Sequence, residues 1–531
     1  MTLFDIKTIL EGNKMKCCII AAGKGSRMGS EYSLTHKTLL PLGNKAIISH
    51  IFELFDSSCE FVVIVGYKSN LIIDYISIAH PGLNVTYVEV DNFDGPGSGP
   101  GYSLYCAKEL LNSPFFFTAS DTIITGSLPE FNENWIGIQE VPSPENWCSI
   151  TLNPDGDVKD IFYKKHSSAK HAFVGAGYIK DFELFWQGLG KQNLHDNELQ
   201  VINGLESLLA VKLGTRTLNW IDTGSKEQYN IALKKFHKNF SFVGKSTDLT
   251  YKINNTVIKY FPDKTSAKLR YERALTHNNA FAPVQQLIGN YFSCDFIEGK
   301  LLSQARTYLN YKYFLAWAEK NLWRDLEIPQ KIKHETLRLF YIEKTLGRLN
   351  DFCVKYLKGA EVPQMNINSM SCLPVSEILT QIADELCQVG QPSYFHGDLH
   401  EDNIFLLPNG SFKLIDWRES FGSTSDWGDR YYDLAKILHT LELSVDTMDK
   451  GGFVINQSEN GIFINHNVEF SSLDATQAFW EFVKERKYDE RRIRVINAII
   501  FVNMSPLYNC ELANYLYLLG RYQINKLFMD R

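Results

Sequence analysis

One segment of the chain spaces three polar side chains in the way that phosphoryl transfer requires. In FHGDLHEDNIFLLPNGSFKLIDW, Asn403 follows Asp398 after five residues, and Asp416 follows Asn403 after thirteen. Phosphoryl transfer needs a group that orients the acceptor hydroxyl, together with ligands for the Mg²⁺ that bridges the phosphates. The spacing predicts Asp398 as the catalytic residue, and Asn403 and Asp416 as the metal ligands.

Residues upstream of this segment complete a nucleotide site. Lys259, in the strand-like run TVIKYF, is placed to pair with nucleotide phosphates, and Glu272, on a helical segment thirteen residues later, is its natural ion-pair partner. Taken alone, either residue is more simply interpreted as a surface charge. The hairpin before Lys259 carries a single glycine, Gly244, so we expect Ser246 and Thr247 to make the phosphate contacts there.

A second candidate site begins at a Gly-rich turn near the N-terminus. The turn GKGSRMG follows the apolar run CCIIAA. Backbone N–H groups of a turn between a strand and a helix can approach phosphate oxygens, and two basic side chains add positive charge. A tight turn with no ligand explains this fragment equally well. The nucleotide-binding candidates are Gly23, Lys24, Gly25, Ser26 and Arg27.

Two carboxylates strengthen the case for this second site. Asp121 ends the run FFFTASD and Asp222 ends the run LNWID, while Lys37 lies ten residues after Arg27. Both aspartates are expected at the carboxyl edge of a sheet, where the Gly-rich turn also lies. Mg²⁺ usually takes one or two protein carboxylates and otherwise keeps water or phosphate oxygens. The two aspartates are therefore predicted Mg²⁺ ligands, although each is also a suitable turn or helix-capping residue.

The motifs AAGKGSRM, THKTLLPLGNKAII, SDT and WIDTGSKEQY resemble the sugar-1-phosphate nucleotidyltransferase superfamily. The resemblance covers about 220 residues and implies that the Gly-rich turn, with Arg27, holds the nucleotide, that Lys37 contacts phosphate, and that Asp121 and Asp222 bind Mg²⁺. His36 stands where sugar enzymes usually have proline, which is closer to bacterial phosphocholine cytidylyltransferases. The Gly-rich stretch 94–104 departs from those enzymes, is expected to shape the base or acceptor pocket, and leaves the acceptor open.

The motifs HGDLHEDN, IDWRES and GDRYYDLAK resemble the aminoglycoside phosphotransferase and choline kinase superfamily over about residues 240–440. That family shares the protein-kinase fold and phosphorylates hydroxyls of small molecules. Ile-Asp-Trp, in place of Asp-Phe-Gly, favours a small-molecule acceptor. Asp433 is expected to brace the catalytic loop.

These residues require two different scaffolds. Short apolar runs alternate with helical segments from Met15 to about Lys235, which is typical of a mostly parallel α/β sheet. From about residue 240 the pattern changes to antiparallel strands and then to helices. We therefore predict an α/β nucleotidyltransferase domain, Rossmann-like and GT-A-like, at residues 1–238, and a protein-kinase-like α+β domain at 239–531, with an N-lobe at 239–299 and a C-lobe at 300–531.

Composition narrows the class of partner and the compartment. The chain has 531 residues, 54 basic and 61 acidic side chains and a net charge of −7, so it carries no basic footprint for nucleic acid. Its apolar runs are far shorter than the ~20 residues of a membrane span. Ten cysteines without a CxxC pair predict reduced thiols and a cytoplasmic location.

Together the two halves predict consecutive reactions. A kinase would phosphorylate choline, ethanolamine or a similar amino alcohol with ATP, and a nucleotidyltransferase would transfer a nucleotidyl group, CMP from CTP, to the phosphate for surface polysaccharide synthesis. A sugar kinase joined to a sugar-1-phosphate nucleotidyltransferase is the alternative. A regulatory pseudoenzyme that binds nucleotide without turnover is the alternative from another class.

Overall fold

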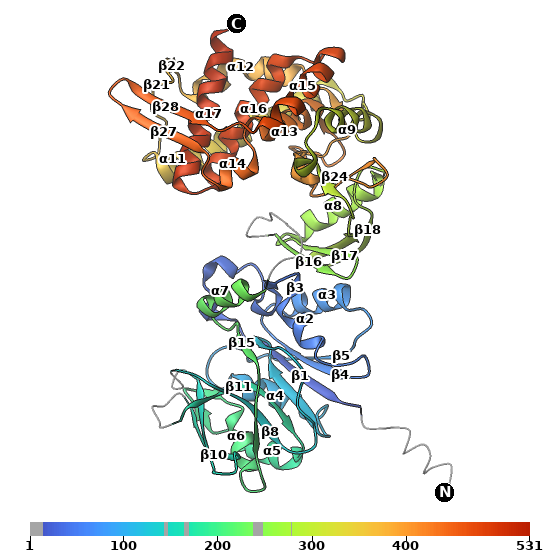
Figure 1. The fold of residues 1–531 in the computed structure, drawn as a ribbon, viewed down its shortest axis with the longest axis vertical. Helices are drawn as coiled ribbons and strands as arrows, with labels where there is room; N and C mark the ends of the chain where they lie inside the picture. Colours follow the sequence, from blue (N-terminus) through green and yellow to red (C-terminus); the bar gives the residue numbers. More distant parts are fainter. Residues whose placement is uncertain (1–13, 143–146, 164–168, 237–247, 278, 531) are drawn as a thin grey trace. The chain divides into compact units, whose positions relative to one another are not determined.

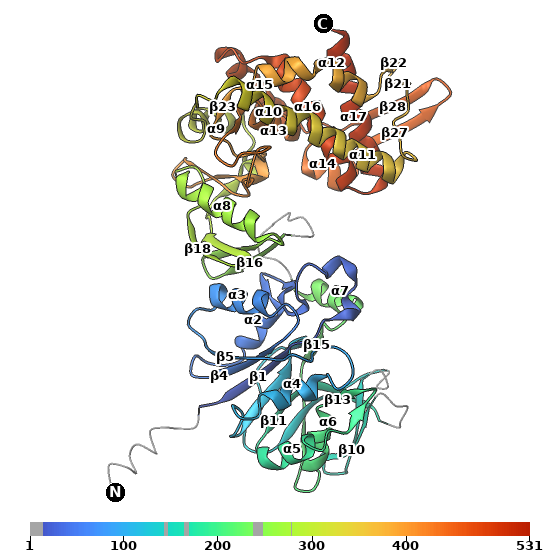
Figure 2. The same cartoon turned by 180° about the vertical axis from the view of Figure 1, so that it is seen from behind.

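The computed structural model describes residues 14–142, 147–163, 169–236, 248–277 and 279–530. The chain forms two compact units, whose elements are drawn from two sides in Figures 1 and 2. The first unit comprises Met1–Ala267 and Gln285–Cys294, and the second comprises Lys268–Val284 and Asp295–Arg531. The first unit thus runs past residue 238, where the sequence suggested a boundary.

A nine-stranded sheet forms the centre of the first unit. Its order is β10-β9-β11-β6-β1-β4-β5, and β8 pairs with both β11 and β14. The strands β5, β4, β1 and β6 are parallel, whereas β11 is antiparallel to β6 and β8. The bounds are β1 Lys16–Ala21, β4 Glu60–Val65, β5 Asn84–Glu89, β6 Phe115–Ala119, β8 Trp135–Glu140, β9 Cys148–Leu152, β10 Val158–Tyr163, β11 His171–Ile179 and β14 Gly214–Thr217.

Alternate residues of the parallel strands enter two different cores. Cys17 and Ile19 of β1 pack in one core, and Cys18 packs in the other. Because successive side chains of a strand point to opposite faces, a strand covered on both faces is apolar throughout. The first core includes α2 (Ile47–Phe52) and α3 (Ser69–Ala79), and the second includes α4 (Pro100–Cys106), α5 (Phe182–Leu189) and α6 (Ile202–Leu208).

A small antiparallel sheet and a set of short elements complete the first unit. The sheet has the order β16-β17-β19-β18, and three tyrosines of its strands, Tyr251, Tyr260 and Tyr291, are buried in the core that contains α3. The strands that the sequence assigned to a kinase N-lobe therefore share a core with the nucleotidyltransferase fold. The bounds are η1 Ser26–Met28, η2 Ser30–Tyr32, η3 Lys37–Leu39, β2 Pro41–Leu42, β3 Lys45–Ala46, β7 Thr122–Ile124, β12 Leu194–His195, β13 Glu198–Leu199, β15 Trp220–Asp222, α7 Lys226–Lys235, β16 Leu249–Ile253, β17 Thr256–Tyr260, β18 Val284–Ile288 and β19 Tyr291–Asp295.

Helices dominate the second unit, as the sequence predicts. Helices α13, α16 and α17 form its centre, where α16 packs against both α13 and α17 (Figure 2). The bounds are α8 Lys264–Thr276, which crosses from the first unit, η5 Leu302–Ala305, α9 Tyr308–Asn321, α10 Gln330–Arg338, the π-helix η6 Leu339–Glu343, α11 Lys344–Tyr356, α12 Val375–Gln388, η7 Glu401–Asn403, α13 Arg430–Glu442, α14 Val445–Asp449, α15 Phe470–Glu485, α16 Glu490–Met504, η8 Ser505–Leu507 and α17 Cys510–Met529.

Three small sheets connect these helices. The antiparallel strands β24 and β25 flank the turn between Asn403 and Asp416, as the catalytic-loop pattern requires. The hairpin β27–β28 joins β21 and β22 in a four-stranded sheet. The bounds are β20 Lys300–Leu301, β21 Met365–Ile367, β22 Met370–Cys372, β23 Pro392–Ser393, β24 Ile404–Leu406, β25 Phe412–Leu414, β26 Gly428–Asp429, β27 Phe453–Ser458 and β28 Gly461–His466.

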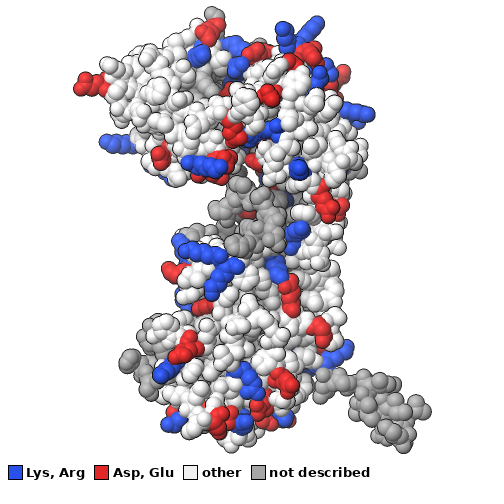
Figure 3. All heavy atoms as spheres, in the orientation of Figure 1, with Lys and Arg blue, Asp and Glu red and all other residues white. Residues whose placement is uncertain are grey.

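Charge is distributed without a dominant sign on the visible surface. On the face shown in Figure 3, Lys and Arg lie among Asp and Glu. Within the described ranges, the structure contains no helix that is both long and apolar enough to cross a membrane.

Candidate active sites

The Gly-rich turn after β1 brings Lys37 against its backbone. Gly25 adopts a φ of 67°, and a Cβ there would lie 3.0 Å from Cδ of Lys37. A side chain at position 25 would therefore displace the lysine. The Lys37 Nζ atom lies 2.6 Å from Oδ2 of Asp121, and both side chains are at least four-fifths buried. The turn, the lysine and the first carboxylate thus form one cluster.

His36 fixes the segment that carries Lys37. Its Nδ1 atom accepts a hydrogen bond from the Thr38 N–H at 3.2 Å, so Nε2 carries the proton and donates to the Gly23 carbonyl oxygen at 2.9 Å. Burial, with Lys37 nearby, lowers the pKa of His36 to about 3, which keeps the ring neutral. The histidine that stands in place of proline ties the lysine segment to the Gly-rich turn.

The two aspartates converge on Gly224. Strand β15 pairs with β7, so that Asp222 lies opposite Thr122. A Cβ on Gly224 would lie 2.9 Å from Oδ2 of Asp121 and 3.1 Å from Oδ1 of Asp222. It would also lie 3.2 Å from the Arg27 guanidinium. Glycine leaves this space open between two carboxylates and a cation.

Electrostatics favour a cation between the aspartates. Burial raises the pKa of Asp222, and the Asp121 carboxylate raises it further. Burial also acts upward on Asp121, but Lys37 and Arg27 outweigh it and hold the pKa of Asp121 below its ordinary value. Two carboxylates that oppose one another fit Mg²⁺, which takes one or two protein carboxylates. Among the described residues, no group of three or more His, Cys, Asp or Glu side chains is arranged for a metal.

The remaining polar residues of the turn lie at its exposed edge. Arg27 and Ser26 lie exposed on η1, and Lys24 forms an ion pair with Asp94. That pair joins the turn to the Gly-rich stretch 94–104, which packs on β13. A Cβ at Gly99 would lie 2.6 Å from the Leu199 carbonyl oxygen, so close packing accounts for this glycine.

In the second unit, the catalytic loop presents Asp398 beside a buried lysine. Nζ of Lys436 lies 2.9 Å from Oδ1 of Asp398, whose side chain is 30% exposed. Burial raises the pKa of Asp398, but Lys436, His400 and Arg418 outweigh it and hold the pKa well below its ordinary value. Asp398 is therefore ionised, and it can accept a hydrogen bond from an acceptor hydroxyl.

Asn403 and Asp416 flank the same loop. The Asn403 amide nitrogen donates to the Asp398 carbonyl oxygen at 2.9 Å and contacts Nε2 of His400 at 3.0 Å, so only its oxygen can serve a metal. The Ile415 N–H donates to the Asn403 carbonyl oxygen at 3.0 Å, which holds the residue before Asp416 against the loop. Asp416 has a φ of 59°. An amide oxygen and a carboxylate suit Mg²⁺.

Two buried residues brace this loop. Asp433 accepts the N–H groups of His396 and Gly397, each at 2.8 Å. His396 in turn contacts the Ile415 carbonyl oxygen through Nε2 at 2.8 Å. Burial lowers the pKa of His396 to about 3, so the ring is neutral. The Asp433 bonds join the loop to α13, as expected for Asp433, and the His396 bond joins the loop to the residue before Asp416.

Comparisons with known proteins assign a family to each of these regions. The family model described as the MobA-like NTP transferase domain matches residues 17–128, and that of the phosphotransferase enzyme family matches residues 331–454. The chain joins a nucleotidyltransferase domain to a phosphotransferase domain.

Relatives resemble the nucleotidyltransferase domain. Bifunctional protein GlmU of Methanocaldococcus jannaschii is 25% identical over 199 residues, 37% of this chain and 47% of that protein. UTP–glucose-1-phosphate uridylyltransferase AglF of Haloferax volcanii is 28% identical over 116 residues, 22% of this chain and 46% of that protein. The chain spans about half the length of these curated relatives. A UDP-glucose pyrophosphorylase structure complexed with UDP-glucose has 19% identity and a TM-score of 0.37, and the match covers 42% of this chain and 97% of that one.

The predicted nucleotide-binding residues of the phosphotransferase domain are only partly placed. Lys259 is buried in β17, in the first unit. Glu272 is half-exposed on α8 and lies 3.7 Å from Lys268 of the same helix. The Lys259–Glu272 pair stays a prediction. Ser246 and Thr247 lie outside the described residues.

A choline acceptor would need aromatic faces around its quaternary ammonium. The candidates for such a box are the aromatic residues that follow the catalytic loop in the sequence, and each is buried or already in contact with another side chain. Trp417 is 2% exposed, and its ring stacks 4.6 Å from Phe281. The Trp480 ring already carries the guanidinium of Arg494, 4.2 Å from its centroid. The other candidates, each less than a tenth exposed, are Trp427, Tyr431, Tyr432 and Phe482.

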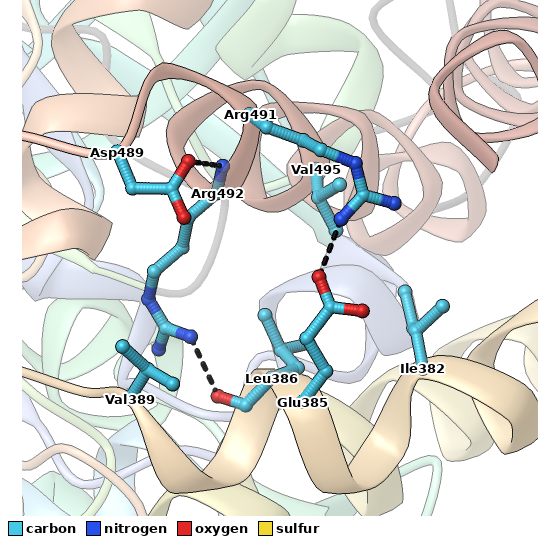
Figure 4. A pocket seen from close by; sticks show the side chains of 8 residues that line it. All are labelled: Ile382, Glu385, Leu386, Val389, Asp489, Arg491, Arg492 and Val495. Carbon is cyan, nitrogen blue, oxygen red and sulfur yellow. Dashed lines mark hydrogen bonds and ion pairs between the residues drawn. The ribbon is translucent and has the colours of Figure 1, made fainter. Parts of the chain in front are cut away.

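One cavity in the phosphotransferase domain is structural. It has a volume of about 30 Å³ and lies between α12 and α16 (Figure 4). Arg491 forms an ion pair with Glu385 across it, and Arg492 donates to the Leu386 carbonyl oxygen. Its volume suits about one water molecule, so it is not a substrate site.

Sequence reasoning gave no role to His36 and did not single out Lys436. Lys436 follows Asp433 by three residues on α13, so the two residues lie on neighbouring positions of one helix face. That spacing was the available signal for a second contact with the catalytic loop.

Proposed function

We propose that this chain phosphorylates a small alcohol with ATP and then transfers a nucleotidyl group to the resulting phosphate. The observation that carries the proposal is that one polypeptide holds both sets of acidic residues. Asp121 and Asp222 face the open space at Gly224 in one domain, and Asp398 adjoins Asn403 in the other. A phosphate monoester made by the first reaction is the acceptor that the second one needs.

In the phosphoryl step, Asp398 orients the acceptor hydroxyl and takes its proton. The hydroxyl oxygen forms a bond to the γ-phosphorus of ATP, the bond from that phosphorus to the β–γ bridging oxygen breaks, and ADP leaves. Asn403 and Asp416 would hold Mg²⁺, which supplies charge neutralisation at the phosphates when bound.

In the nucleotidyl step, an oxygen of the new phosphate bonds to the α-phosphorus of the nucleoside triphosphate, and pyrophosphate leaves. Lys37 and Arg27 balance the charge that spreads over the phosphate oxygens. Gly23, Gly25 and Ser26 offer the backbone turn for the triphosphate, with Lys24 at its rim. Asp121 and Asp222 would hold Mg²⁺, which polarises phosphate oxygens when bound.

Two acceptor classes follow from the likenesses. The THK motif favours an amino alcohol such as choline or ethanolamine, with CTP as the nucleotide donor and a surface polysaccharide as the destination. The likeness to a protein named UTP–glucose-1-phosphate uridylyltransferase favours a sugar phosphate instead. Since both reactions consume nucleoside triphosphates, we place the enzyme in the cytoplasm. A regulatory pseudoenzyme would bind nucleotides and turn over neither.

The test is a panel of amino alcohols, polyols and sugars incubated with ATP, CTP, UTP and Mg²⁺, with products identified by mass. We expect one acceptor to gain a phosphate and then a nucleotidyl group. Asp398→Asn should stop the first product, and Asp222→Asn should stop the second while the first accumulates. Binding of both nucleotides without Asp398-dependent or Asp222-dependent turnover would favour the pseudoenzyme.

A further inference from the structure

Lys344 lies on a block of aromatic rings close to the catalytic loop. It is the first residue of α11, and its Nζ atom is 3.9 Å from the centroid of the Phe340 ring. Phe340 stacks on Phe421 at 3.8 Å and meets the edge of Tyr432 at 4.8 Å. The ring under the lysine is thus itself packed between two further rings, and a cation on an aromatic face is stabilised by the ring.

Arg418 approaches the same block from the segment after Asp416, and its N–H donates to the His396 carbonyl oxygen of the catalytic loop at 3.0 Å. A Cβ on Gly397, the neighbour of Asp398, would lie 2.9 Å from Cβ of Arg418 and 3.1 Å from its Cδ. The guanidinium lies 5.9 Å from the centroid of the Tyr432 ring. Lys436 lies one helical turn after Tyr432 and contacts Asp398. Arg418 and Lys436 therefore both place positive charge near the Asp398 carboxylate.

Positive charge exceeds negative charge around this block. Asp398 already forms an ion pair with Lys436, and Glu419 forms one with Arg270 at 2.7 Å. Arg348 follows Lys344 by one turn on the same face of α11. In the described part of the chain, no carboxylate lies within ion-pair distance of three of these basic side chains, which are Lys344, Arg348 and Arg418.

The behaviour of Lys344 agrees with this surplus. Burial lowers its pKa to about 6, and the neighbouring Arg418, Arg348 and Lys436 act in the same direction, against the opposite effect of Asp398. Like charges disfavour the charged form of a buried group, and an anion placed among them would restore it. A cationic acceptor at this place would be repelled.

We propose that the alcohol phosphorylated at Asp398 carries an anionic group, a carboxylate or a phosphate, that Lys344, Arg348 and Arg418 bind. The hydroxyl then faces Asp398, and it attacks the γ-phosphorus of ATP with loss of ADP, as in the proposed function on which this inference rests. The acceptor differs from the amino alcohol that the sequence favours. The buried aromatic candidates, which offer no open box for a quaternary ammonium, support the same reading.

The experiment uses the full chain, ATP and Mg²⁺ with five small acceptors. Glycerate carries a carboxylate, glycerol 3-phosphate carries a phosphate, glycerol is neutral, and ethanolamine and choline are cations. We expect kcat/KM for glycerate or glycerol 3-phosphate to exceed that for glycerol by about tenfold or more, and the two cations to react most slowly. The better of the two anions identifies the group that the site binds.

Variants separate acceptor binding from nucleotide binding. Lys344→Met and Arg348→Gln should each lower kcat/KM for the anionic acceptor about tenfold more than for glycerol, with little change in KM for ATP. Lys355→Met, at an exposed position of the same helix, should leave kcat/KM unchanged both for the anionic acceptor and for glycerol. Calorimetry with glycerate and glycerol 3-phosphate in the absence of ATP measures binding without turnover, and Lys344→Met should weaken it.

Three results would overturn the proposal. Preference for choline or ethanolamine would exclude an anionic acceptor but leave the kinase function intact. A rise in KM for ATP in Lys344→Met that matches the rise for the acceptor would assign the cations to the γ-phosphate of ATP. The inference would also be overturned if none of the five acceptors were phosphorylated in an Asp398-dependent reaction and neither anion gave a heat of binding. Failure of the wider acceptor panel would overturn the proposed function itself.

Discussion

At the scale of single residues, the second unit contains a buried ion pair between Asp429, the N-cap residue of α13, and Arg492 on α16. Nη2 of Arg492 lies 2.8 Å from Oδ2 of Asp429, and the two side chains are 5% and 0% exposed. Asp429 also accepts the hydroxyl of Tyr341 at 3.0 Å. Removal of one partner of such a pair leaves an uncompensated charge in the core.

Arg492→Met should therefore lower the free energy of unfolding of the second unit by about 3–5 kcal/mol. Arg494→Met is the matched control, because Arg494 lies two residues further on α16 and is partly exposed, with an i,i+4 pair to Glu490. We expect that variant to cost about 1 kcal/mol or less, because it loses one exposed ion pair and the contact with the Trp480 ring. Urea unfolding of both variants measures the difference. Equal effects would mean that Arg492 contributes no more than a surface arginine.

A histidine in the first unit gives a prediction about pH. Nε2 of His80 contacts the Ser49 hydroxyl at 2.8 Å, and burial lowers the pKa of His80 to about 4. The unfolded chain binds a proton near pH 6.5, so this site loses stability as pH falls from about 6.5 to 4. At about pH 5 the loss amounts to about 2 kcal/mol.

His80→Gln should accordingly destabilise the first unit by about 1 kcal/mol near pH 7.5, where a hydrogen bond is lost. Near pH 5 the variant should equal or exceed the wild type in stability, because glutamine does not titrate and the folded state no longer has to keep a buried imidazole unprotonated. Urea unfolding at both pH values tests this crossing. A constant difference between wild type and variant would show that His80 does not titrate between these pH values.

The sequence predicted residue types better than it predicted their neighbours. Lys37, Asp121 and Asp222 could be proposed together because each follows a strand, and the carboxyl ends of strands meet at one sheet edge. The structure brings these three together, and their roles stay predictions. The contacts of His36 and Lys436 depend on side chains far apart in the chain, which no local pattern contains.

At the scale of elements, the sheet β16-β17-β19-β18 is the main difference from expectation. The Tyr251 hydroxyl donates to the Leu39 carbonyl oxygen at 2.6 Å, and the Tyr260 hydroxyl donates to that of Leu34 at 2.6 Å. Tyr291 packs in the same core, 6.0 Å from the ring of Tyr75 on α3. Strand periodicity gave the sheet itself, but a local pattern does not say which neighbour covers it. The segment that carries Lys37 is thus supported by strands from beyond residue 238.

A chain of residues 1–295 should therefore fold and keep nucleotidyl transfer, whereas a chain of residues 1–238 should melt at a lower temperature. Each large apolar side chain that loses burial costs about 1.5–3 kcal/mol. Tyr251→Ala in the full chain should lower stability in the same direction, and Tyr313→Ala, at a position 61% exposed, should not. Thermal melts and transfer rates of the four proteins are the measurement. Equal stability and activity of the two truncated chains would restore the boundary near 238.

At the scale of the whole molecule, the two proposed reactions are linked by the phosphate monoester that the first makes and the second consumes. If each reaction depends on its own acidic residues, a chain defective in one should still perform the other. Asp121→Asn should stop at the phosphorylated alcohol and release ADP only. Asp398→Asn should make the nucleotide conjugate only when the phosphorylated alcohol is supplied.

A mixture of the two variants should then convert the alcohol to the nucleotide conjugate, because the phosphate can leave one chain and enter another. We expect a lag that shortens as the concentration of Asp121→Asn rises, and one ADP and one pyrophosphate released for each conjugate formed. Each variant incubated alone is the control and should give no conjugate from the alcohol. If the mixed variants also gave none while each half-reaction stayed active, the monoester would have to pass within one chain and the two sites would not act independently.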